Sequence, residues 1–246
     1  MIIDEKLSMS KEKQNIAIFG ANGFIGSALC RHYQKESHVY AFSRKNFDSD
    51  NTGLNKILLN DYEEETLSEA ASGYKDDFFN TIIVSIGMLH NHEFMPEKRI
   101  EDFSSDQFLE TVKINTLIPT LIAKSFHKKL KIKEKSTLAF LSARVGSISD
   151  NRTGGWYSYR ASKAGLNMVV KNLSIELGRL NKELVVIGLH PGTVDTPLSQ
   201  PFQKNLKDSK IFSSNFSVLK LSLIINSLDV ESSGKCIAWD GKEILP

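Results

Sequence analysis

The sequence predicts an α/β fold, in which one parallel sheet carries helices on both faces. Apolar segments alternate with helical segments along almost the whole chain, and strands separated by helices imply parallel pairing through right-handed crossovers. The run at 81–86 is predominantly apolar rather than alternating, as expected of a strand that is buried on both sides. A glycine-rich turn at 20–26 joins the first apolar segment to the first helix, which is typical of doubly wound sheets.

The predicted elements follow one another in strand–helix order from residue 16 onward. The strand at 16–19 leads into a helix at 25–34, and the apolar residues 39–42 form the centre of a strand at 38–43. A strand at 56–59 then precedes a helix at 63–72 with an acidic start. The remaining strands are expected at 81–86, 137–141, 184–189 and 235–239, and the remaining helices at 105–130, 157–180 and 218–228. We expect residues 14–246 to form a single domain and residues 1–13 a flexible N-terminal tail.

Composition excludes several classes of protein. A chain of 246 residues suffices for one α/β domain, and its net charge of +2 gives no broad field that would favour nucleic acid. No apolar run approaches the length of a membrane span. Cys30 and Cys236 lie in apolar contexts, which indicates core thiols and a reducing, cytoplasmic compartment. His90 and His92 have no third ligand at a diagnostic spacing, so we expect a polar pocket rim there and no metal site.

The glycine-rich turn has the strand–turn–helix context of a dinucleotide site. Gly20 can adopt backbone angles closed to other residues, Gly23 leaves room for a pyrophosphate, and Gly26 permits close packing of helix on strand. The free N–H groups at the start of the helix favour an anion. The predicted cofactor loop comprises Gly20, Asn22, Gly23, Phe24, Ile25 and Gly26. A tight connection that holds no ligand is the alternative.

Tyr159 and Lys163 are four residues apart in a predicted helix, so their side chains share one face. A free tyrosine has a pKa of about 10 and is a poor acid or base near neutral pH, but a nearby cation favours the phenolate and lowers that pKa. The pair is therefore a candidate acid/base catalyst for a carbonyl or an alcohol. The same spacing is common on solvated helices, and the glycine turn upstream is what favours the catalytic interpretation.

The two features together resemble the short-chain dehydrogenase/reductase family. The runs at 142–147 and 154–163 look most like the branch that contains the C-factor (C-signal) signalling proteins, and His-Pro-Gly-Thr-Val-Asp-Thr at 190–196 is similar to the family's segment after its sixth strand. The resemblance implies a single Rossmann-type doubly wound sheet, a homodimer or homotetramer, and a small-molecule carbonyl or alcohol substrate. It also implies that Gly87 lies against the cofactor ribose and that the nicotinamide side is lined by Pro191, Gly192, Val194 and Thr196.

The end of the second strand predicts which dinucleotide binds. An acidic residue there would bind the ribose hydroxyls of NAD, whereas this chain has Ser43 and Arg44 followed by a lysine. The planar fork of Arg44 suits a 2′-phosphate, and Ser43 offers a hydroxyl, so NADP (NADPH) is the expected cofactor. The alternative is an ordinary surface cation. Asp61 matches the family position that contacts the adenine, and it could equally cap the following helix.

The remaining catalytic positions rest on the resemblance. Asn115 matches the family asparagine that distorts its helix and holds a water linked to the active-site lysine. The serine that polarises the substrate carbonyl is replaced by Ala143. Ser142 has strand geometry against it, but a bend at the strand end could turn it toward the site, and Ser147 lies on the loop beyond. We expect Ser142 to take the role.

The sequence thus predicts an NADP-dependent oxidoreductase that transfers a hydride between nicotinamide and a carbonyl/alcohol pair, with Tyr159 passing the proton and Lys163 beside it. The residues at 197–212 would close over the substrate. The alternative, which Ala143 favours, is an NADP-binding signalling or sensor protein of the C-factor type with little turnover.

Overall fold

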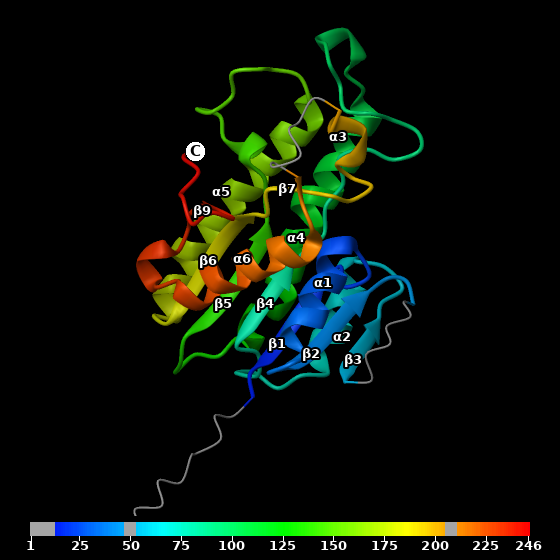
Figure 1. Cartoon of the computed structure of the whole chain (residues 1–246). Coiled ribbons are helices and arrows are strands. Elements are labelled where there is room, and N and C mark those ends of the chain that lie inside the picture. Colours follow the sequence, from blue (N-terminus) through cyan, green and yellow to red (C-terminus); the bar gives the residue numbers. More distant parts are fainter. Residues whose placement is uncertain (1–12, 47–52, 205–210) are drawn as a thin grey trace, which may run out of the picture.

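A seven-stranded parallel sheet runs through the protein in the strand order β3-β2-β1-β4-β5-β6-β9 (Figure 1). The computed structural model describes residues 13–46, 53–204 and 211–246, so most of the predicted tail at 1–13 lies outside the described residues. The strands of the sheet are β1 (Asn15–Phe19), β2 (His38–Ser43), β3 (Leu54–Leu58), β4 (Thr81–Val84), β5 (Ser136–Leu141), β6 (Leu184–His190) and β9 (Cys236–Ala238). The predicted doubly wound fold is confirmed.

Helices cover both faces of this sheet, each over its own apolar core (Figure 1). The helices α1 (Phe24–Tyr33) and α6 (Ser214–Ser227) pack on one face, where Leu29 and Leu221 are buried. The other face carries α2 (Glu64–Ser72), α4 (Ile118–Phe126) and α5 (Tyr157–Leu180). This arrangement explains why the central strands are apolar on both sides.

The helix predicted at 105–130 is interrupted in its middle. It divides into α3 (Ser105–Val112), a π-helical turn at Lys113–Leu117 and α4, and a 3₁₀ turn follows at His127–Lys129. Such π-turns inside helices are frequent at functional sites. Two short strands that the sequence pattern did not predict, β7 (Thr193–Val194) and β8 (Ile211–Phe212), pair in parallel beyond β6.

The strand order predicts where on the sheet a ligand would bind. The order reverses between β1 and β4, and in open α/β sheets the crevice at the carboxyl ends of the strands next to such a switch point binds ligands. The glycine turn follows β1, Gly87 follows β4, and Ala143 follows β5. Within the described residues, no helix is long and apolar enough to cross a membrane, and no cluster of His, Cys, Asp and Glu could hold a metal ion.

Candidate active site

The glycine turn fits an anion at the start of helix α1. Gly20 has a φ of +80°, and a Cβ there would lie 3.0 Å from Ser85 Oγ. A Cβ on Gly26 would lie 2.1 Å from the Gly20 carbonyl oxygen, so no side chain fits at that position. Gly23 stands at the N-cap without a side-chain cap, which leaves the first N–H groups of α1 open to a ligand. These observations fit a dinucleotide pyrophosphate. Asn22 lies in the turn, Phe24 and Ile25 begin helix α1, and their contacts with a cofactor stay predictions.

Ser43 and Arg44, at the end of β2, do not both face a ligand as predicted. The Ser43 side chain is buried, and its hydroxyl donates to the Lys45 carbonyl oxygen at 2.6 Å. Ser43 therefore shapes the turn, and its hydroxyl is not presented to solvent. Arg44 is exposed, with its guanidinium carbon 5.3 Å from the centroid of the Tyr62 ring. This stacking holds the cation at the end of β2, and its contact with a 2′-phosphate stays a prediction.

Asp61 acts at the start of helix α2. Its Oδ1 accepts the Glu63 N–H at 3.0 Å. Hydrogen bonds from the Thr66 side chain and then from the Glu63 N–H hold the pKa of this carboxyl below its ordinary value. Glu63 is the N-cap of α2 and has no side-chain cap hydrogen bond, so Asp61 closes a turn just before the helix and does not cap it, and the adenine contact stays a prediction.

Tyr159 and Lys163 share the inward face of α5, as their spacing predicts. Both side chains are buried, and Lys163 Nζ lies 5.9 Å from the centroid of the Tyr159 ring. Lys163 donates to the Leu141 carbonyl oxygen at 2.9 Å. Burial lowers the pKa of Lys163 to about 8 and raises the pKa of Tyr159 to about 12. The expected lowering of the Tyr159 pKa by the neighbouring cation is therefore not found, because desolvation of the phenolate outweighs it.

Asn115 lies inside the π-helical turn and is fully buried. Its Oδ1 accepts the Met88 N–H at 2.7 Å, and its Nδ2 donates to the Met88 carbonyl oxygen at 2.8 Å and to Ser162 Oγ at 3.0 Å. The amide side chain thus ties the loop after β4 to helix α5. The predicted helix distortion is present, and the water relay stays a prediction.

Ser142 does not reach Tyr159. The backbone continues as extended strand, since the Ser142 N–H donates to the Leu189 carbonyl oxygen at 2.8 Å, and the side chain therefore points to the other side. Its hydroxyl donates to Asn167 Oδ1 at 2.6 Å. Ser147 is buried, and its Oγ accepts the Asp150 N–H at 3.1 Å. The bend that we expected at the strand end is absent, and Ala143 is the residue that packs with Tyr159.

An apolar enclosure surrounds Tyr159. It consists of Leu89, Ala143, Val145, Trp156, Leu198 and Phe202. The Trp156 and Phe202 rings lie 4.9 Å apart, and the Trp156 and Tyr159 rings 6.2 Å apart. His90 Nε2 lies 3.2 Å from the carbonyl oxygens of Pro197 and Leu198. His90 therefore connects the loop after β4 to the segment that contributes Leu198 to this enclosure. The part of the predicted closing segment at 205–210 lies outside the described residues.

The residues after β6, which are predicted to line the nicotinamide, form a closely packed segment. Gly192 has a φ of +78°, and a Cβ there would lie 2.6 Å from the Phe212 ring. The Pro191 carbonyl oxygen accepts Ser217 Oγ at 2.8 Å, and both Val194 and Thr196 are buried. Across the crevice, a Cβ on Gly87 would meet Lys163 Nζ at 3.4 Å and Asn115 Oδ1 at 3.5 Å. A small residue at Gly87 therefore keeps space open beside the buried lysine.

Helix α5 begins in a way that sequence reasoning missed. Trp156 occupies the N-cap in the left-handed region (φ +54°), and its side chain has no oxygen with which to cap the helix. The buried Glu97 caps the helix from a distant loop: its carboxylate accepts the Ser158 N–H at 3.3 Å and the Ser158 hydroxyl, and its carbonyl oxygen accepts the Trp156 N–H. The signal in the sequence was the lack of Ser, Thr, Asp or Asn directly before this helix.

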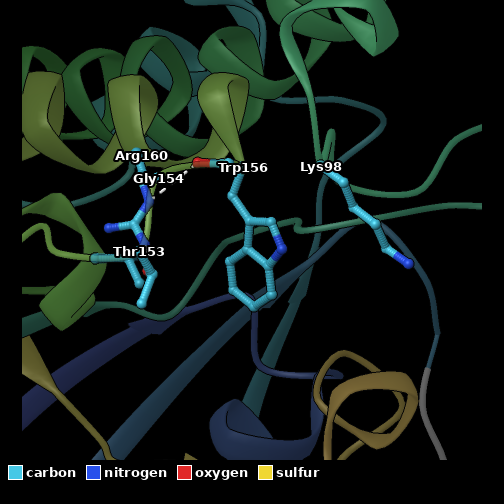
Figure 2. A pocket seen from close by; sticks show the side chains of 7 residues that line it. Lys98, Thr153, Gly154, Trp156 and Arg160 are labelled. Carbon is cyan, nitrogen blue, oxygen red and sulfur yellow. Dashed lines mark hydrogen bonds between the residues drawn. The ribbon is translucent and has the colours of Figure 1, made fainter.

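A pocket of about 450 Å³ opens beside this helix start. It is lined by Lys98, Val145, Thr153, Gly154, Gly155, Trp156 and Arg160. Figure 2 shows the Trp156 indole extending into the view between Lys98 on one side and Arg160 with Thr153 on the other. Val145 and Trp156 belong both to this pocket and to the enclosure around Tyr159, so the two spaces adjoin.

The buried charge of Lys163 predicts a pH-dependent stability. Below pH 8 this lysine is protonated in both states, and the folded state carries the full cost of burying it. Between its folded pKa of about 8 and its ordinary value of 10.5, unfolding takes up a proton, so its contribution to stability rises by about 1.4 kcal/mol per pH unit. Below pH 8, Lys163→Met should therefore be more stable than the parent protein. By pH 10.5 this difference in the free energy of unfolding should shrink by up to ~3 kcal/mol, because the parent becomes more stable.

Urea unfolding at pH 7 and pH 10 measures this difference. Lys171→Met, at an exposed position further along α5, is the control and should show no such change. A stability difference between Lys163→Met and the parent that is equal at the two pH values would contradict the lowered pKa.

The distant cap also predicts a stability effect. Glu97→Ala leaves the buried N–H and hydroxyl of Ser158 without their acceptor, which should lower the free energy of unfolding by about 1–3 kcal/mol. Glu97→Gln keeps an acceptor oxygen and should cost less. The matched control is Glu93→Ala in the same loop, where the side chain is exposed. Equal urea midpoints for Glu97→Ala and Glu93→Ala would show that the cap carries no energy.

Comparison with known proteins agrees with this geometry. The model of the short chain dehydrogenase family matches residues 14–207. The C-signal protein of Myxococcus xanthus is 32% identical over 134 residues, which cover 54% of this chain and 75% of that protein. This relative confirms the resemblance to the C-factor branch. A benzil reductase ((S)-benzoin forming) of Bacillus cereus is 28% identical over 223 residues, covering 83% of this chain and 85% of the relative.

Among solved structures, the NADPH-bound carbonyl reductase from chicken fatty liver superposes with a TM-score of 0.80 at 21% identity, covering 95% of this chain and 94% of that one. At this identity the likeness shows the shared fold. The match of the family model over most of the sequence shows more: the chain belongs to the short chain dehydrogenase family.

Proposed function

We propose that the protein is an NADPH-dependent carbonyl reductase in which Tyr159 donates the proton to the substrate oxygen. The observation that carries this proposal is a buried tyrosine, with a pKa raised to about 12, inside an apolar enclosure at the carboxyl ends of the strands. A protonated phenol is suited to giving a proton to the oxygen of a carbonyl under reduction. The reductive direction is therefore favoured over alcohol oxidation at neutral pH.

The chain's own residues supply binding and proton transfer. Bound NADPH would supply the hydride. The glycine turn and the open start of α1 would hold its pyrophosphate, Arg44 its 2′-phosphate, and Lys163 the ribose next to the nicotinamide. Once Tyr159 has given its proton, the ammonium of Lys163 would stabilise the phenolate that remains. The solved NADPH-bound carbonyl reductase supports this cofactor assignment.

The substrate side favours apolar and aromatic carbonyl compounds. The enclosure presents the Trp156 and Phe202 rings, and Ala143 puts a methyl group where the family has a hydroxyl. The benzil reductase relative is named for an aromatic diketone, which such an enclosure would accept. Because neither Ser142 nor Ser147 reaches Tyr159, the substrate oxygen has one donor fewer. The loss of one such donor costs about 10²–10³ in rate.

A second function is favoured by Ala143. An NADP-binding protein that senses or signals, with turnover as a residual property, needs the cofactor cleft and does not need the missing hydroxyl. The C-signal relative supports this candidate. Subunit assembly as a homodimer or homotetramer and a cytoplasmic location stay predictions from the family resemblance.

The chain should bind NADPH more tightly than NADH. Arg44 is the exposed cation at the end of β2 and has no carboxylate beside it in the sequence, so Arg44→Asp should abolish or reverse the preference. Calorimetric titration with both cofactors measures it, and Arg152→Asp on an exposed loop is the control. Equal affinity of the parent protein for NADPH and NADH would refute the assignment.

Substitutions of Tyr159 and of Ala143, which packs against it, should change turnover in opposite directions. Tyr159→Phe removes the proton donor and keeps the packing, so NADPH affinity should persist while turnover falls by about 10²-fold or more. Ala143→Ser places a hydroxyl in the enclosure and should raise turnover by about 10-fold or more. The control is Ser142→Ala, which should change turnover little because the Ser142 hydroxyl points to Asn167. A native rate for Tyr159→Phe would exclude Tyr159 as the donor.

A further inference from the structure

The pocket beside the start of α5 carries positive charge without an acidic partner. Lys98 and Arg160 line it, and its lining includes no Asp or Glu. Within the described part of the chain, neither cation forms an ion pair. Arg160 is half-buried, so its charge is less screened by water than that of a fully exposed arginine.

Two hydrogen bonds fix the Arg160 guanidinium, and its other N–H groups are left without partners among the described residues. Its Nε donates to the Gly155 carbonyl oxygen at 3.1 Å, and its Nη2 donates to Thr153 Oγ1 at 2.9 Å. Both partners are neutral. Both N–H groups of Nη1 and the second N–H of Nη2 have no partner among the described residues, and these form the planar fork that suits a carboxylate.

The pocket adjoins the reacting centre. Arg160 follows Tyr159 directly in helix α5, and Trp156 and Val145 line both the pocket and the enclosure around Tyr159. A ring lying against the Trp156 indole would therefore present its carbonyl group to Tyr159 and another substituent to the pocket.

We propose that this pocket is an anion subsite, and that the carbonyl substrates of the enzyme carry a carboxylate which Arg160 binds, with Lys98 adding positive charge from the opposite wall. The proposal rests on the proposed function, since it names the substrate class of the same site. The buried carboxylate of Glu97 does not line the pocket and is turned to the N–H and hydroxyl of Ser158 at the helix start. Asp150 is likewise paired, with Arg144 at 3.5 Å.

A pair of ligands that differ only in charge tests the subsite. 4-Formylbenzoate and its methyl ester share the ring and the aldehyde, and their dissociation constants can be measured by calorimetry on the protein saturated with NADP⁺, where no hydride is available. We expect the carboxylate to bind about 10-fold or more tightly than the ester at low salt, as a charge-assisted fork implies. High salt should reduce the difference.

Variants assign the effect to its residues. Arg160→Gln should remove the preference, Arg160→Lys should retain part of it, and Lys98→Gln should weaken carboxylate binding about 2- to 5-fold while leaving the ester unchanged. Lys98 is exposed and its ammonium has no hydrogen bond or ion pair among the described residues, so its variant tests the charge without a folding defect. Arg99→Gln, the adjacent exposed arginine that is already paired with Asp102, is the matched control.

The outcomes separate this proposal from the proposed function. Equal binding of the two ligands by the parent protein, or a preference that survives Arg160→Gln, would overturn the subsite. If the preference is present and depends on Arg160, the subsite stands, and the rates of NADPH oxidation with the same two ligands then test the reductase separately. A carboxylate preference without any turnover would leave the anion subsite in a protein that is not a reductase.

Discussion

The first turn of helix α5 is anchored from outside the helix, by the carboxylate of Glu97. This helix carries Tyr159 and Lys163 on its inward face and Arg160 at the edge of the pocket. Its N-cap is given to Trp156, which contributes a ring to the substrate enclosure and cannot satisfy the helix N–H groups. A buried acid from another loop resolves this conflict, because the orphan N–H groups and the positive end of the helix dipole both favour a carboxylate.

Desolvation sets the chemistry of the residues that this helix carries. Both Tyr159 and Lys163 are buried, and burial disfavours the charged form of each: the phenol is harder to ionise and the ammonium easier to deprotonate. A lysine 5.9 Å from the tyrosine ring therefore does not produce a resting phenolate. The pair instead holds a proton on the tyrosine, which suits reduction of a carbonyl.

Much of the fold follows from local sequence patterns. The strand at 38–43 and the helix at 157–180 have their predicted bounds, although the cap that Glu97 supplies to this helix left no local signal. The helix predicted at 105–130 does not, because periodicity alone does not reveal that Asn115 bonds to the backbone of Met88 and opens a π-turn. The short strands β7 and β8 pair over only two residues each, which is too little to leave a sequence pattern.

The parts of the candidate site that depend on residues close together in the sequence could be predicted. The glycine turn and the Tyr159–Lys163 spacing depend on neighbours in sequence. Glu97, the orientation of Ser142 and the charge around Arg160 depend on contacts across the fold, so the sequence pattern could not supply them.

We propose that a buried, protonated Tyr159 makes this cleft a catalyst despite Ala143. A single-turnover experiment tests it most directly: excess protein is mixed with NADPH and an aromatic diketone such as benzil, and absorbance at the nicotinamide band is followed beside a cofactor titration of the same sample. We expect stoichiometric NADPH binding followed by slow but complete oxidation that requires the diketone. Stoichiometric binding with no oxidation, across diketones, aldehydes and quinones, would contradict catalysis by Tyr159 and favour a nucleotide sensor.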